Sequence, residues 1–247
     1  MITGHEANAG RAAFLEALAT GMGAAAIISY DGTANDDDAL ALGRLLVPDA
    51  TSLALAYVRH APEIDPERES LAQHDAERKL ADGAALLGDP EIPRHVVLSA
   101  STGTGLQELA DSEGASLIVF GSDYRTPPGH AEPPNSAQQL LEIGETAVAI
   151  AAAGLRVDPP THIRTIAVLP VDEDDAAQRT ASGLSQMLGA QVVEAVPPTA
   201  DLIVVGSPRG APVGRLVLSG AARGMLDASR GSVLVVPAGK PVLLQAV

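Results

Sequence analysis

The chain has 247 residues, and 31 Asp and Glu against 16 Lys and Arg give it a net charge of −15. That charge disfavours a general nucleic-acid binder and an anionic membrane surface, because both partners require a basic face. The absence of cysteine excludes disulfides, thiolate metal sites and a cysteine nucleophile. Three Tyr, two Phe and no Trp are too few for a base-stacking platform.

Strands and helices alternate along the first 150 residues. Apolar runs predict strands at 25–30, 52–58, 95–99, 116–120 and 146–151, and helical periods predict helices at 36–46, 67–87, 103–112 and 135–143. Short apolar strands separated by helices predict an open parallel sheet that is covered on both faces, in three α/β/α layers. This unit occupies 24–153.

The flanking segments carry weaker signals. Residues 1–23 form an N-terminal extension without a basic leader, and the apolar stretch at 12–28 is interrupted by Glu16 and three glycines. We therefore expect no transmembrane segment and a cytoplasmic protein. After the first unit, the stretch 154–163 contains Pro159-Pro160 and is expected to be a linker.

An internal repeat with an offset of 85 residues organises the rest of the chain. The run LIVFGS at 117–122 recurs as LIVVGS at 202–207. Five residues downstream recur at the same offset, namely Pro127, Gly129, Ala137, Leu141 and Val148. A weaker pair matches Asp31 with Asp172, each of which closes an apolar strand. The segment 164–247 is therefore interpreted as a second, shortened unit that lacks a helix–strand–helix block.

One segment of the second unit resists assignment. Residues 191–196 have a strand pattern, but only four residues separate them from the strand expected at 201–205. A parallel crossover needs a dozen or more residues. We therefore expect 191–196 to be an extended linker or an antiparallel strand.

The second unit suits an anionic ligand beyond the carboxyl ends of its strands, where open parallel sheets bind ligands. Glycines allow close backbone approach, a helix start offers free N–H groups, and arginines pair with phosphate oxygens. The candidates are Gly206, Ser207, Arg209, Gly210, Gly214, Arg215, Ser219 and Gly220, with Asp172 as an acceptor for a sugar hydroxyl or adenine amine. Asp31 and Gly121 are the counterparts in the first unit, whose loop contains four prolines and Glu132 and is expected to be rigid and ligand-free.

These residues resemble the universal stress protein family, in tandem form over most of the chain. Members have a five-stranded, Rossmann-like sheet of the adenine nucleotide α-hydrolase-like type, an Asp that closes strand one, and a Gly-x2-Gly-x9-Gly-Ser loop that cradles ATP phosphates. Gly206 matches the first glycine, Arg209 stands at the second, and Ser219-Gly220 replaces Gly-Ser. In the first unit only Gly121 matches, with Pro134-Asn135 at the Gly-Ser position.

The resemblance has further implications for ligands and assembly. It implies ATP as the cofactor, with Mg²⁺ only alongside the nucleotide. It also implies that the two units pair through their last strands as a pseudo-dimer within one chain, and that the chain itself forms a homodimer. The segment 206–215 is similar to the variant Gly-Ser-x-His-Arg-Gly-Pro-Leu-Gly-Arg of tandem members.

Two functional hypotheses remain open. The first is a non-enzymatic stress-response protein that senses or stores ATP, and the second is an interaction module that has lost its ligand. Gly121 and Gly206 are also explained as simple turns, and Asp31 and Asp172 as helix N-caps. We predict no catalytic residue and no metal site, because neither Gly-x-Ser-x-Gly nor Gly-x4-Gly-Lys-Ser/Thr occurs. The small-residue stretch 99–105 could cradle an anion, and Ser/Thr helix capping explains it equally well.

Overall fold

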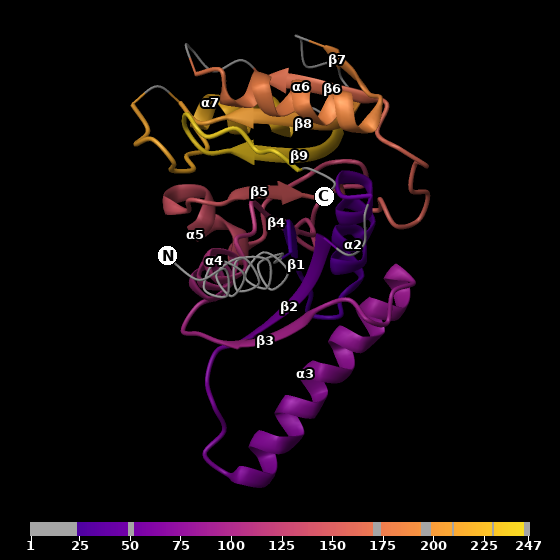
Figure 1. The fold of residues 1–247 in the computed structure, drawn as a ribbon, viewed down its shortest axis with the longest axis vertical. Helices are drawn as coiled ribbons and strands as arrows, with labels where there is room; N and C mark the ends of the chain where they lie inside the picture. Colours follow the sequence, from indigo (N-terminus) through magenta and orange to yellow (C-terminus); the bar gives the residue numbers. More distant parts are fainter. Residues whose placement is uncertain are drawn as a thin grey trace, which may run out of the picture.

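The computed structural model describes residues 24–48, 52–169, 174–193, 199–208, 210–228 and 230–244. Within them, nine strands form one sheet in the order β3-β2-β1-β4-β5-β9-β8-β6-β7 (Figure 1). The strands are β1 (Ala26–Ser29), β2 (Leu53–Arg59), β3 (Arg94–Leu98), β4 (Leu117–Phe120), β5 (Ala147–Ile150), β6 (Thr165–Leu169), β7 (Gln191–Val193), β8 (Thr199–Gly206) and β9 (Arg230–Val236). The helices are α2 (Ala34–Leu46), α3 (Pro66–Leu87), α4 (Thr102–Glu113), α5 (Asn135–Ile143), α6 (Ala176–Leu188) and α7 (Gly220–Asp227).

Helices cover both faces of the sheet, which confirms the three-layer α/β/α architecture. Successive strand residues point to opposite faces, so Ile28 packs in the cluster that contains Leu42 of α2 and Leu80 of α3. Ile27 packs on the other face, in the cluster that contains Leu106 of α4. Helix α6 joins the first cluster, and α5 and α7 join the second. All the strands and helices expected in the first unit are present, within three residues at each end.

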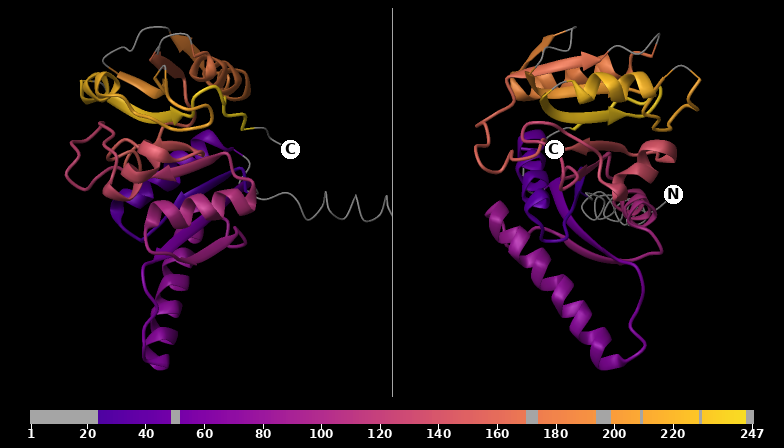
Figure 2. Two further views of the ribbon diagram at one scale, coloured as in Figure 1. Left: turned by 90° about the vertical axis from the view of Figure 1, so that its left-hand side faces the viewer. Right: turned by 180° about the vertical axis from the view of Figure 1, so that it is seen from behind.

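The sheet consists of two halves with related strand order. The first half runs β3-β2-β1-β4-β5, and the second half, β7-β6-β8-β9, repeats the order β2-β1-β4-β5 without a counterpart of β3. Figures 1 and 2 show the second half, in orange to yellow, stacked on the first. The halves meet where β5 pairs antiparallel with β9, with Val148 opposite Val235 and Ile150 opposite Val233. The expected pairing of the two units through their last strands is therefore confirmed.

The expectation for 191–196 was wrong. Residues 191–193 form β7, which pairs parallel with β6, whereas β8 pairs parallel with the opposite edge of β6. The crossover argument assumed that β7 and β8 are neighbours, but β6 lies between them. A strand of three residues advances only about 10 Å, so the chain can return to the start of β8 without a helical crossover. Residues 194–196 lie outside the described residues.

A buried carboxylate fixes the start of the expected linker. Asp38 in α2 is fully buried, and its Oδ2 accepts hydrogen bonds from the Gly154 amide and from Nη1 of Arg156, both at 2.8 Å. Its Oδ1 accepts from the Arg156 amide at 2.7 Å. The turn at 154–156 is therefore attached to the first half. The domain boundaries 24–153, 154–163 and 164–247 stay predictions, because the sheet runs without a break through both halves.

None of the helices in the described ranges is long and apolar enough to cross a membrane.

Candidate functional site

The loops that follow β4 and β8, at 121–135 and 206–220, share one hydrogen-bonded scaffold; we call them the first and second loop. The buried Ser122 hydroxyl donates to the Ala151 carbonyl at 2.6 Å, and 85 residues later the buried Ser207 hydroxyl donates to the Val236 carbonyl at 2.9 Å. Further bonds with the same offset are Glu132 N to Ser122 Oγ, Gly129 N to Ala153 O and Ala153 N to His130 O in the first loop, and Val217 N to Ser207 Oγ, Gly214 N to Ala238 O and Ala238 N to Arg215 O in the second. The sequence repeat is thus a repeat of backbone structure, in which Ser207 holds the loop.

The first loop is closed by the start of α2. The Asn35 side chain donates from Nδ2 to the Ser122 carbonyl at 2.8 Å. A Cβ atom at Gly121 would lie 2.0 Å from the Asn35 carbonyl oxygen. Glycine at 121 is therefore required by the close approach of α2, which supports its interpretation as a structural turn.

A carboxylate of the chain itself occupies the loop after β1. Oδ2 of Asp36 accepts from the amides of Asp31 at 3.0 Å and Thr33 at 2.9 Å, and from the Thr33 hydroxyl at 2.7 Å. Gly32, between the two amides, has a left-handed φ of 80°. Backbone N–H groups arranged in this way form an anion-binding concavity. Since Asp36 fills it, these N–H groups are not available to a phosphate.

The two candidates of the first unit, Asp31 and Gly121, are brought together in a hollow of about 350 Å³ at the carboxyl ends of β1 and β4. Asp36 and Asp123 also line this hollow, and no Lys, Arg or His does. Burial, and next the Asp36 carboxylate, raise the pKa of Asp31, although Lys79 and His60 lower it in part. A triphosphate is therefore disfavoured here, because it would add negative charge to three carboxylates.

The second loop presents open backbone. Gly210 and Gly214 have left-handed φ values of 92° and 81°. A Cβ atom at either position, or at Gly220, would meet no heavy atom of a described residue within 4 Å. Ser219 caps α7 by accepting from the Ala222 amide at 3.1 Å, which confirms the helix start expected there. Gly206 ends β8, directly before this loop.

Three other candidates of the second unit do not join this open surface. Nη2 of Arg215 lies 2.9 Å from Oε1 of Glu145, in the connection between α5 and β5. Arg215 therefore ties the second loop to the first half. Glu145 carried no sequence signal, because its counterpart 85 residues later is an arginine. Asp172 and Arg209 lie outside the described residues.

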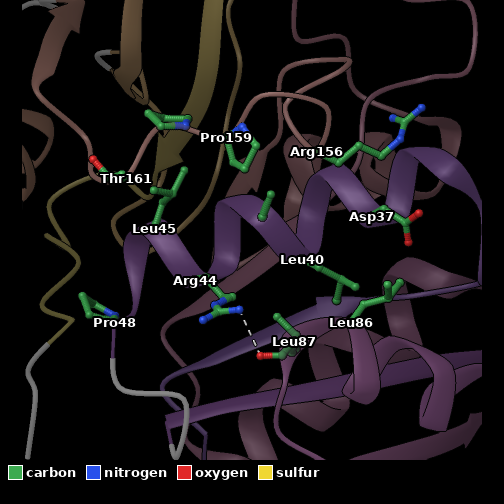
Figure 3. Close-up of a pocket in the computed structure, with 12 residues that line it drawn as sticks. Asp37, Leu40, Arg44, Leu45, Pro48, Leu86, Leu87, Arg156, Pro159 and Thr161 are labelled. Carbon is green, nitrogen blue, oxygen red and sulfur yellow. Dashed lines mark hydrogen bonds between the residues drawn. The ribbon is translucent and has the colours of Figure 1, made fainter.

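A separate hollow of about 680 Å³ lies between α2, the end of α3 and the linker (Figure 3). Leu40, Leu45 and Leu86 give it an apolar lining. Arg44 donates to the Leu87 carbonyl at 3.1 Å, while Arg156 lies at the other end of the hollow (Figure 3). The two guanidinium groups do not converge, so this hollow lacks the polar geometry of a nucleotide site.

Among the described residues, no group of three or more His, Asp or Glu side chains is placed to hold a metal ion.

Solved structures share this fold. A universal stress protein from Archaeoglobus fulgidus DSM 4304 has a TM-score of 0.62 at 14% identity, over 86% of this chain and 97% of that chain. A protein assigned to the universal stress proteins from Pseudomonas aeruginosa UCBPP-PA14 has a TM-score of 0.57 at 14% identity, over 90% and 95% of the two chains. A protein of unknown function from Pseudomonas aeruginosa PAO1 has a TM-score of 0.56 at 14% identity, with the same coverage. No protein-family model and no curated protein sequence matches the chain. The chain therefore has the α/β fold of universal stress proteins, which is the adenine nucleotide α-hydrolase-like fold.

Proposed function

We propose that this is a non-enzymatic stress-response protein of the universal stress protein type that binds ATP at the second loop, with Mg²⁺ only alongside the nucleotide. The observation that carries this proposal is the contrast between two loops on one scaffold. The first is closed by Asn35 and lined with carboxylates. The second presents three glycines with open space above them.

The open loop has the donors that phosphates require. The amides of Gly210 and Gly220 donate to no described residue. Gly220 is the first residue of α7, where the helix dipole favours an anion. In this proposal the phosphates lie against these amides, Arg209 pairs with phosphate oxygens and Asp172 accepts from the adenosine. Ser207 and Ser219 hold the backbone in shape, because their hydroxyls are already engaged.

Calorimetric titration of ATP with Mg²⁺ tests the proposal. In Gly220→Asp, the added carboxylate stands in open space and is compatible with the helix dipole, but it repels phosphate. We expect this variant to lose the binding heat and Gly220→Asn, which has the same shape without the charge, to keep most of it. Asn135→Asp adds the same charge at the first residue of α5, exactly one repeat earlier, and should bind like wild type.

The alternative is a ligand-free interaction module, which is favoured by the closed state of the first loop. Absence of binding heat in the wild type, together with absence of nucleotide in the purified protein, would support it. We place the protein in the cytoplasm and propose that it forms a homodimer. Because β5 is already paired with β9, self-pairing of sheets would use the outer strands β3 or β7. Light scattering measures the oligomeric state directly.

A further inference from the structure

The seam between the two halves has an approximate two-fold relation that its charges do not follow. The register of β5 and β9 sets Val148 opposite Val235, and the same register appears again when both numbers are exchanged through the 85-residue offset. On one side of the seam Arg215 pairs with Glu145 at 2.9 Å. On the other side the offset places His130 where Arg215 stands, and Arg230 where Glu145 stands.

Arg230 is the consequence of this exchange. It is exposed at the start of β9, and its Cδ lies 3.6 Å from the position of a Cβ at Gly129, so its stem rests on the first loop. The Gly231 amide donates to the Gly129 carbonyl at 2.9 Å and fixes the two segments together. Among the described residues, the Arg230 guanidinium forms no ion pair.

A second guanidinium shares the same hollow. A cavity of about 870 Å³ lies between the carboxyl end of β5, the linker and the amino ends of β8 and β9, and Arg164 and Arg230 both line it. Arg164 immediately precedes β6 and Arg230 begins β9, with β8 between the two strands. Their backbones are therefore separated by two strand spacings of about 4.8 Å each. Two arginine side chains can bridge that distance around one ligand.

The acidic residues nearby leave these donors available. Oδ2 of Asp201 accepts from the amides of Arg164 at 2.8 Å and Thr165 at 2.9 Å. The Nε atom of Arg164 is 3.9 Å from the same oxygen, beyond hydrogen-bond distance. Arg156, also in the lining, is held by Asp38, and Asp158 is the remaining carboxylate of the lining. Arginines thus outnumber acids in this cavity, although the whole chain has a net charge of −15.

We propose that this seam is a binding site for a compact phosphate-bearing anion, held by Arg164 and Arg230. The planar fork of a guanidinium matches phosphate oxygens with two parallel hydrogen bonds. The site is distinct from the second loop and does not depend on ATP binding there. Because its walls come from both halves of the sheet, a bound anion would link β9 to the linker.

Calorimetric titration of inorganic pyrophosphate in the Gly220→Asp background, which blocks the second loop, tests the seam. We expect binding that weakens by at least about tenfold in Arg230→Gln and in Arg164→Gln. Arg230→Glu, which introduces the acid that position 145 carries, should abolish it. Arg68→Gln removes the same charge from an exposed position of α3 and should bind as the parent does.

Three results would overturn the seam proposal. One is absence of heat in the Gly220→Asp parent, and if wild type still binds pyrophosphate, the anion lies at the second loop and the proposed ATP site gains support. Another is equal loss in Arg230→Gln and Arg68→Gln, which would indicate a general charge effect. The third is unchanged binding in both seam variants, with their folding verified by thermal unfolding.

Discussion

The two loops after β4 and β8 have one backbone and opposite chemistry. Ser122 and Ser207 make matching bonds to the last strand of their own half, and Gly129 and Gly214 both have left-handed φ values near 80°. Everything that faces outward differs. The first loop carries prolines and acids, and α2 closes over it. The second loop carries glycines, with open space above them.

This difference teaches that a duplicated unit keeps the residues that fix its backbone more strictly than those that face a ligand. The anchoring carboxylates give a second example. Asp38 accepts from the amide of Gly154 and Asp174 from the amide of Gly239, and these glycines are one repeat apart. The Asp38 carboxylate is buried and also pairs with Arg156, whereas Asp174 is in an exposed bond. The same attachment is therefore stronger in the first half.

Replacement of Asp38 should have the largest effect. Asp38→Ala removes a buried carboxylate with three hydrogen bonds and leaves Arg156 without its partner, so we expect a loss of about 4 kcal/mol in the free energy of unfolding. Asp174→Ala, the counterpart in the second half, should cost about 1 kcal/mol. Urea unfolding of both variants measures the difference. Equal losses would contradict the unequal anchoring of the two halves.

The two kinds of glycine should respond next most strongly. Gly121→Ala forces a methyl group against the Asn35 carbonyl, and we expect a loss of about 3 kcal/mol. Gly220→Ala places the same methyl in open space and should change stability by less than about 0.5 kcal/mol. Thermal unfolding distinguishes them, and similar melting temperatures would show that the first loop is not closed by α2.

The shared scaffold predicts matched effects at the two serines. Ser122→Ala and Ser207→Ala each remove a buried hydroxyl that donates to a strand carbonyl and accepts from a loop amide. Each should cost about 1.5 kcal/mol, because the carbonyl and amide lose their partner. Chemical denaturation of the pair tests this equivalence. A loss at one serine only would mean that the two loops are not held alike.

Asp31→Asn should give the smallest effect, with the opposite sign. The pKa of Asp31 is raised by burial and by Asp36 above its ordinary value of 3.8, so the folded state holds the proton more tightly than the unfolded state. Asp31 therefore costs stability at neutral pH, and this cost disappears as the pH falls below that ordinary value. The variant should be more stable than wild type at pH 7, with a gain that fades at pH 3. A gain of equal size at both pH values would point to a cause other than ionisation.

Much of the fold was predictable because its signals are local. The helix at 67–87, for example, begins after an Asp that caps its first turn and ends at a left-handed glycine, as the structure confirms for Asp65 and Gly88. The offset of 85 residues identified the pairing of β5 with β9 before any coordinates. The position of β7 was not predictable in this way, because it depends on which edge of β6 a three-residue strand joins.

The candidate site was predictable only in part. The glycines of the second loop follow from the repeat and the helix start, and the structure shows them open. The roles of Asp36, Asp38 and Glu145 were missed, because each depends on a partner far along the chain or on a local backbone turn. Adjacent acids at a helix start have a simpler explanation in the helix dipole, so sequence gave no reason to separate Asp38 from its neighbours.

Amide chemical shifts of the glycines during titration with ATP and Mg²⁺ test most directly where the nucleotide binds. Glycine reporters occur in the second loop at Gly210, Gly214 and Gly220, in the first loop at Gly121 and Gly129, and in the seam at Gly154 and Gly231. We predict saturable shifts in the second loop and unchanged resonances in the first loop. Saturable shifts at Gly121 and Gly129 without any at Gly214 and Gly220 would contradict this assignment.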